Sequence, residues 1–85
     1  MFLPDYGEFV RKARLNAAGK VDRSAVDFAW AATALKRGHS LDMVMGELAR
    51  VSLKAAGLPA RSRRAYVRRT VNKARRFICQ TSAKE

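Results

Sequence analysis

The sequence predicts an all-α fold, a small four-helix bundle, and three observations support this prediction. Apolar residues recur every three or four positions, whereas no stretch alternates apolar and polar residues with period two. Residues that cap helices stand at the expected helix ends. The 85 residues contain no repeat and no long linker, so we expect 1–85 to form a single helical domain. The predicted helices span about 5–17, 23–37, 41–54 and 61–80.

The first predicted helix begins at Asp5. Asp5 and Glu8 have the spacing of a capping box, in which each side chain binds the other residue's free amide. Phe9, Ala13 and Leu15 form a loose apolar stripe along this segment. Gly19 is expected to end it, because glycine adopts left-handed geometry at little cost.

The second predicted helix is the central one. Asp22 is a good N-cap and Gly38 a good stop signal. The residues between them are apolar on nearly all sides, so this helix must be buried. Trp30 is therefore predicted to lie in the core rather than to stack on nucleobases. Asp27 within the same helix needs a partner, for which an Arg of another helix is the expected choice.

Ser40 is the expected N-cap of the third helix, and Gly57 and Pro59 place a loop at about 54–60. The fourth helix then follows to about Gln80. Two sets of residues are predicted to face inward. They are Leu41, Val44, Met45, Leu48 and either Val51 or Ser52 in the third helix, and Val67, Thr70, Val71, Ala74, Phe77 and Ile78 in the fourth.

Charge is distributed unevenly along the chain. Residues 1–47 carry 7 basic and 6 acidic side chains, whereas residues 48–85 carry 11 basic and 1 acidic. No acid lies between Leu48 and Lys84. A one-signed surface of this kind favours a polyanionic partner.

The basic residues of the fourth helix are the candidate nucleic-acid-binding site. Arginine suits phosphate recognition, because its planar guanidinium can bond two oxygens at once. Tyr66, at the border of the basic and apolar faces, is a candidate to stack on a base, with a packing role as the equal alternative. The predicted contacts are Arg61, Arg63, Arg64, Arg68, Arg69, Lys73, Arg75, Arg76 and Tyr66.

Catalysis and metal binding find no support in the sequence. The chain has one Cys and one His, which excludes the usual structural zinc sites. No phosphate-binding glycine loop and no suitable pair of acids is present. We expect no catalytic residues, no metal and no cofactor. The single Cys79 fits a reducing, cytoplasmic location, and the absence of a long apolar run argues against a membrane span.

Several segments resemble the C-terminal helical domain of RepB-type plasmid primases. The resemblance covers roughly residues 22 to 74. It rests on Ser24-Ala25-Val26-Asp27-Phe28-Ala29-Trp30, on Leu35-Lys36-Arg37-Gly38-His39-Ser40, on Val44, Leu48 and Ser52, and on Tyr66-Val67-Arg68-Arg69-Thr70-Val71-Asn72-Lys73-Ala74. It implies a helix bundle that accompanies a primase catalytic domain and helps it to engage a template. The catalytic domain itself is absent, so no metal-binding carboxylate is carried over.

We therefore expect a non-catalytic domain of a plasmid or mobile-element primase, active in the initiation of DNA replication. The expected partners are nucleic acid, with a single-stranded DNA template as the first choice, and a primase catalytic domain. No membrane partner is expected. Two alternatives stay open: a basic module that docks on a replication protein, and a small regulator that binds duplex DNA.

Overall fold

A computed structural model of the protein describes residues 3–13, 15 and 17–83, and it confirms the predicted all-α fold. Within these residues no strand forms, and the only extended pairing is an isolated antiparallel bridge between Leu15 and Val21. Five helices follow one another in these residues. They are α1 (Tyr6–Lys12), α2 (Arg23–Lys36), α3 (Leu41–Val51), α4 (Leu53–Ala56) and α5 (Ala60–Ala83).

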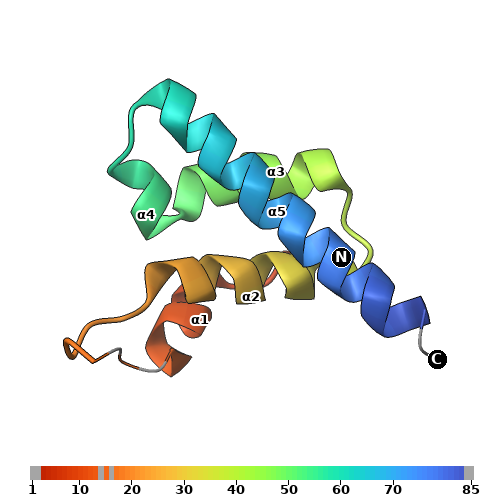
Figure 1. Cartoon of the computed structure of the whole chain (residues 1–85), viewed down its shortest axis with the longest axis horizontal. Helices are drawn as coiled ribbons and strands as arrows, with labels where there is room; N and C mark the ends of the chain where they lie inside the picture. The colour runs from red at the N-terminus through yellow and green to blue at the C-terminus, as the bar shows by residue number, and fades with distance from the viewer. Residues whose placement is uncertain (1–2, 14, 16, 84–85) are drawn as a thin grey trace.

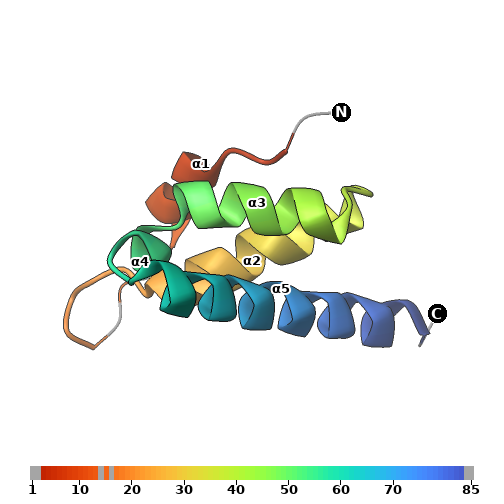
Figure 2. The same ribbon diagram turned by 90° about the horizontal axis from the view of Figure 1, so that it is seen from above.

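The helix α5 lies across both α2 and α3 (Figure 1). Seen from above, α3 and α5 run in opposite directions, and α1, which packs against α2, lies on the side of the bundle away from α5 (Figure 2). The short helix α4 reverses the chain between α3 and α5. One long face of α5 is consequently left uncovered by other helices.

Helix caps confirm most of the predicted boundaries. The side chain of Asp22 accepts a hydrogen bond from the Ala25 amide at 3.2 Å, and that of Ser40 accepts one from the Met43 amide at 3.2 Å. Asp5 caps α1 as expected, although its carboxylate binds the Gly7 amide, at 3.0 Å. Gly38 follows α2 with φ +94°, a conformation that side-chain-bearing residues rarely adopt.

The prediction for the first helix was too long, because α1 ends at Lys12 rather than near residue 17. Ala13 takes an extended conformation, with ψ 143°. Beyond it Leu15 pairs with Val21, and Gly19 turns the intervening chain with φ +77°. Gly19 therefore closes a loop instead of ending a helix. Two positions of the predicted extension, 14 and 16, lie outside the described residues.

The segment predicted as a loop at 54–60 includes all but the first residue of helix α4. Ser52 ends α3 in an extended conformation, and its side chain accepts a hydrogen bond from the Ala55 amide at 3.0 Å. This second cap starts a new helical turn that Gly57 ends. The predicted third helix, 41–54, is therefore divided at Ser52.

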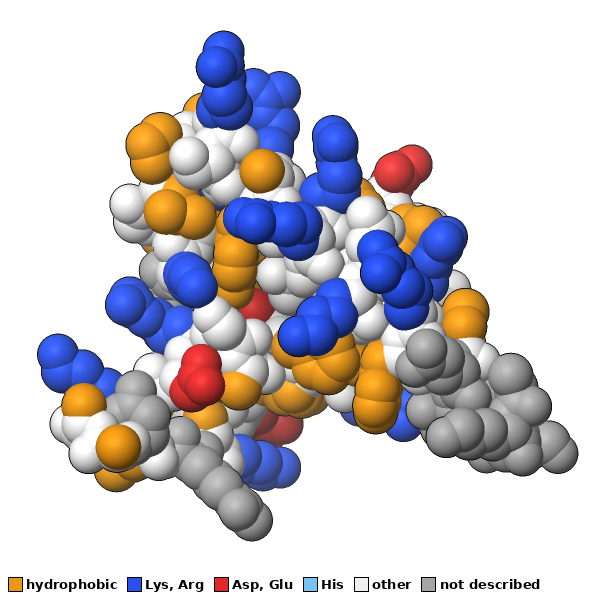
Figure 3. All heavy atoms as spheres, viewed as in Figure 1, with side chains coloured by type: hydrophobic (Ala, Val, Ile, Leu, Met, Phe, Trp, Pro, Cys, Tyr) orange, Lys and Arg blue, Asp and Glu red, His pale blue; other side chains and the backbone are white. Residues whose placement is uncertain are grey.

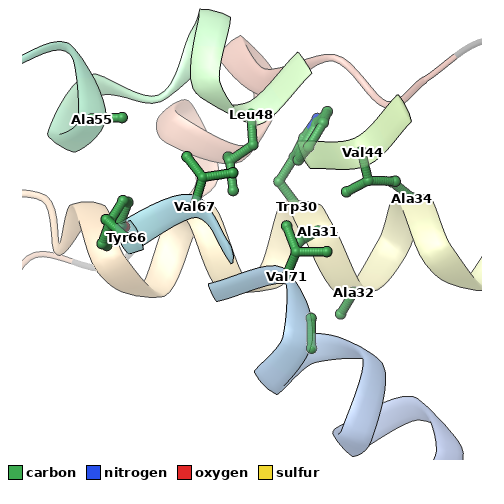
Figure 4. Packing of buried hydrophobic residues seen from close by; sticks show 11 residues of the cluster. Trp30, Ala31, Ala32, Ala34, Val44, Leu48, Ala55, Tyr66, Val67 and Val71 are labelled. Atoms are coloured by element: carbon green, nitrogen blue, oxygen red, sulfur yellow. The ribbon is translucent and has the colours of Figure 1, made fainter. Parts of the chain in front are cut away.

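The core forms where α2, α3 and α5 meet. Trp30 is completely buried, and its indole Nε1 donates a hydrogen bond to the Pro4 carbonyl at 2.8 Å. Val67 of α5 and Leu48 of α3 point toward each other (Figure 4). Several of the smallest side chains in the core come from α2: Ala31, Ala32 and Ala34. Since these side chains are short, the neighbouring helices can pack closely against α2.

Asp27 is buried as expected, but its partners are hydroxyl groups and not an Arg. Its Oδ1 accepts a hydrogen bond from the Tyr6 hydroxyl. Its Oδ2 accepts two more, from Ser52 Oγ at 2.6 Å and from the Tyr66 hydroxyl at 2.5 Å. Both carboxylate oxygens are thus satisfied. The network joins α1, α2, the junction of α3 and α4, and α5, and so fixes how α5 is placed on the bundle.

Candidate nucleic-acid interface

Seven basic side chains on α5 are exposed, and together we call them the basic face. They are Arg61, Arg64, Arg68, Arg69, Lys73, Arg75 and Arg76. In the space-filling view, Lys and Arg side chains spread along the front of the molecule where α5 lies, with apolar side chains between them (Figure 3). Apolar packing of Val67, Val71 and Ala74 on the opposite side of α5 holds this face toward solvent.

Helical periodicity separates the basic face into two rows, because successive residues are rotated by about 100°. The first row consists of Arg61, Arg64, Arg68 and Arg75. It borders α3, where Arg64 and Arg68 line a groove of about 280 Å³ together with Met45, Ala49 and Val67. The second row consists of Arg69, Lys73 and Arg76, and it borders α2. A nucleic-acid strand lying along α5 could therefore contact basic side chains on both of its sides.

Arg63, which was also predicted to bind phosphate, is held by the fold. Its Nε donates to the Ala55 carbonyl at 3.1 Å and its Nη2 to the Leu58 carbonyl at 3.2 Å. These carbonyls lie at the end of α4 and just beyond it, where backbone acceptors need a partner. These two bonds use two of the five guanidinium N–H donors and hold the turn before α5, so we do not count the half-buried Arg63 in the basic face.

Tyr66 takes the packing role rather than the stacking role. Its side chain is 9% exposed and belongs to the core cluster, and its hydroxyl binds Asp27. The ammonium group of Lys54 lies 5.0 Å from the centre of its ring. Burial raises the pKa of Tyr66 to about 12, with the hydrogen bond and the charge of Asp27 acting in the same direction. Since the ring is enclosed, it presents no face to a base.

A different aromatic group lies beside the second row. Phe77, expected to face inward, is 48% exposed. Its ring meets that of half-buried Phe28 in an edge-to-face contact, with centroids 5.6 Å apart. Lys73 Nζ lies 5.7 Å from the centre of the Phe28 ring. The periodicity of α5 placed Phe77 at the margin of its apolar face, and only the packing of α2 shows that this margin is uncovered.

Two acidic side chains already have partners other than the basic residues of α5. Glu47 on α3 is paired with Arg50, with 2.6 Å between Nη2 and Oε2, and this hydrogen bond lowers the pKa of the Glu47 carboxyl. Asp27 is buried in its hydroxyl network. The basic face consequently keeps its positive charge without an acid of α5 to neutralise it.

Two further observations concern other kinds of site. Across residues 3–13, 15 and 17–83, no three His, Cys, Asp or Glu side chains gather in a way that could hold a metal ion. Among the helices of this same part of the chain, none combines the length and the apolar character needed to cross a membrane.

The fold and the surface together define a small all-helical domain with one strongly cationic face. Residues 21–74 match the family of the RepB DNA-primase C-terminal helical domain, so the chain belongs to this family. The match covers α2, α3, α4 and most of α5, and it confirms the family that the sequence resembles. Membership indicates a role in plasmid replication. No curated protein and no solved structure matches the chain.

Proposed function

We propose that this domain binds the single-stranded DNA template of a plasmid primase through the basic face of α5, and that it has no catalytic activity of its own. The observation that carries the proposal is the density and accessibility of positive charge on α5. Seven exposed basic side chains lie on one helix, and six of them are arginines. Helix propensity alone does not require this, because adjacent like charges repel.

The arrangement of the basic face suits a flexible polyanion. Its first and last members, Arg61 and Arg76, are separated by about 22 Å along the helix axis. Contacts spread over this length position a strand by its phosphates and do not depend on base sequence. The family provides the biological context, since a primase domain acts where a single-stranded template is copied. A primase catalytic domain is accordingly the expected protein partner.

Salt dependence tests the proposal directly. If about five of the basic side chains contact phosphates of a single strand, the slope of log affinity against log salt should be about −3.5. Replacing Arg68, Arg69 and Arg76 with Ala should flatten that slope by about 2. The change should cost little stability, because exposed charges contribute little and Ala favours helix. Fluorescence anisotropy with a labelled single strand at several salt concentrations provides the measurement.

A matched control removes the same charge elsewhere. Arg11 and Lys12 lie in α1, which is on the opposite side of the bundle from α5 (Figure 2), Lys20 lies in the loop before α2, and all three are exposed. Replacing these three with Ala should leave the slope almost unchanged. If both triple variants weaken binding equally, net charge alone acts and the basic face is not a site. If the parent domain fails to bind single strands, the template-binding function is wrong, and a protein-docking role is favoured.

A further inference from the structure

We infer that the exposed Phe77 ring, supported by Phe28, is a stacking platform for an unpaired base of the bound strand. The inference rests on the proposed function, because it assigns a position to one base of a strand whose phosphates lie on the second row of the basic face. It goes beyond the family relationship, since Phe77 lies outside the residues that match the family. Stacking on aromatic side chains beside a cationic groove is a common way to hold single strands.

The placement of Phe77 within α5 supports this role. Arg69, Lys73 and Phe77 stand at positions i, i+4 and i+8, and side chains with this spacing lie on one face of a helix. Arg76 is the immediate neighbour of Phe77 in the chain. The basic side chains of Arg69, Lys73 and Arg76 therefore lie next to the aromatic ring of Phe77 on the helix surface. Phosphates held by Arg69 and Lys73 would bring the next base of the strand to Phe77.

Phe28 gives the platform a fixed geometry. The two ring planes are inclined by 69°, and the edge-to-face contact limits rotation of the Phe77 side chain. Phe28 in turn projects from the rigid helix α2 and has Lys73 above its ring. A ring held in this way loses little freedom when a base stacks on it, so more of the stacking energy is available for binding.

Stacking on the Phe77 ring requires a base that is unpaired. In a duplex the base faces are already stacked inside the helix, and exposing one would require unpairing. A single strand presents its bases without this cost. The proposal therefore predicts that Phe77 contributes to the affinity for single strands but contributes almost nothing to the affinity for duplex DNA.

A strand without bases provides the sharpest experiment. The parent domain should bind a short oligothymidylate more tightly than a strand of equal length that contains only sugars and phosphates. Phe77→Leu keeps an apolar side chain against Phe28 but removes the aromatic face. It should weaken binding of oligothymidylate by about fivefold to a hundredfold, the range expected for one stacked base. Its affinity for the strand without bases and its salt slope should equal those of the parent.

Two controls keep the outcomes distinct. Phe77→Tyr retains the ring and should bind like the parent. Met43→Ala removes another exposed large apolar side chain, from the first turn of α3, and should also have no effect. Circular dichroism checks that every variant is folded.

The possible results separate this inference from the proposed function. If the parent binds with the expected salt slope but Phe77→Leu binds both strands as the parent does, the platform is wrong and template binding stands. If the parent binds neither strand, the proposed function fails first. Tighter binding of an acidic, aromatic-containing peptide than of oligothymidylate would overturn both and identify a protein partner.

Discussion

At the scale of single residues, the buried Asp27 connects several helices of this fold. A buried carboxylate is costly unless all its oxygens are hydrogen-bonded. Here Tyr6, Ser52 and Tyr66 provide three donors from three separate segments. Ser52 has a second task, because the same hydroxyl oxygen caps α4. The network therefore ties the start of the chain, the break between α3 and α4, and the basic helix α5 to the central helix.

This network predicts a loss of stability in alkali. The folded-state pKa of Tyr66 is raised from 10.0 to about 12, so the folded protein holds the phenolic proton more tightly than the unfolded chain does. The resulting contribution is fully present below pH 10.0 and is lost as the pH rises through about 12. Urea unfolding across this interval should show a falling free energy of unfolding.

Tyr66→Phe is the matched control for that decline. The variant should be less stable than the parent at neutral pH by about 1–3 kcal/mol, because the bond to a charged group is lost. It should also lose less stability between pH 10 and pH 12 than the parent does, since no proton remains to be released at this position. An identical decline in both proteins would show that Tyr66 is not the group responsible.

At the scale of elements, α5 combines two different faces in one helix of 24 residues. Val67, Val71 and Ala74 are buried against α2 and α3, and the basic face lies on the side of α5 that is exposed to solvent. Since the core face holds the helix in place, the exposed arginines are not needed to pack α5 against the bundle. Arg63 is the exception, because its bonds to the Ala55 and Leu58 carbonyls hold the turn that precedes α5.

Replacing two of the glycines with Ala should change the stability of the domain in opposite directions. Gly46 lies inside α3, and a Cβ atom there would meet nothing within 4 Å. Gly46→Ala should therefore stabilise the domain by about 0.5–1 kcal/mol, because glycine loses more backbone entropy on folding. Gly38 has φ +94° after α2, so Gly38→Ala should destabilise by about 1 kcal/mol or more. Thermal unfolding of the two variants measures both changes in stability. If both substitutions raise the Tm, or both lower it, one of the two predictions is wrong.

At the scale of the whole molecule, a net charge of +11 on 85 residues is concentrated in the C-terminal half. Such a charge opposes compact folding through self-repulsion. Binding a polyanion relieves this repulsion, so a template strand would both find its site through the field of the protein and stabilise the fold. The positive charge that would recognise a polyanion is therefore also a cost to the stability of the free domain.

This cost predicts that salt stabilises the free domain. Adding sodium chloride to about 0.3 M shortens the Debye length to well below 10 Å, which screens repulsion across the basic face. The Tm should rise by a few degrees. The variant with Ala at Arg68, Arg69 and Arg76 should gain less, because it carries three fewer positive charges. A Tm that falls with salt would mean that attractive ion pairs outweigh repulsion.

Local patterns in the sequence were sufficient for the helical class, the caps at Asp22 and Ser40, the burial of Trp30 and the cationic nature of α5. Each of these follows from contacts within one or two turns, or from the periodicity of apolar residues along one segment. The start and end of α2 were predictable for the same reason, because cap residues and Gly38 act on the neighbouring backbone. The early end of α1 was not predictable in this way. The pairing of Leu15 with Val21, which are six residues apart, competes with the continuation of the helix.

Side chains from distant segments decided the remainder. The partners of Asp27 lie 21, 25 and 39 residues away in the chain, so no local spacing relates them. Tyr66 and Phe77 both stand at the margin of the apolar face of α5, and the sequence left stacking and packing as equal alternatives for Tyr66 but placed Phe77 inward. The packed bundle encloses Tyr66 beneath Lys54 and beside Asp27 and leaves Phe77 at the surface against Phe28. Helical periodicity assigns a residue to a face, but only the neighbouring helices determine how much of that face is covered.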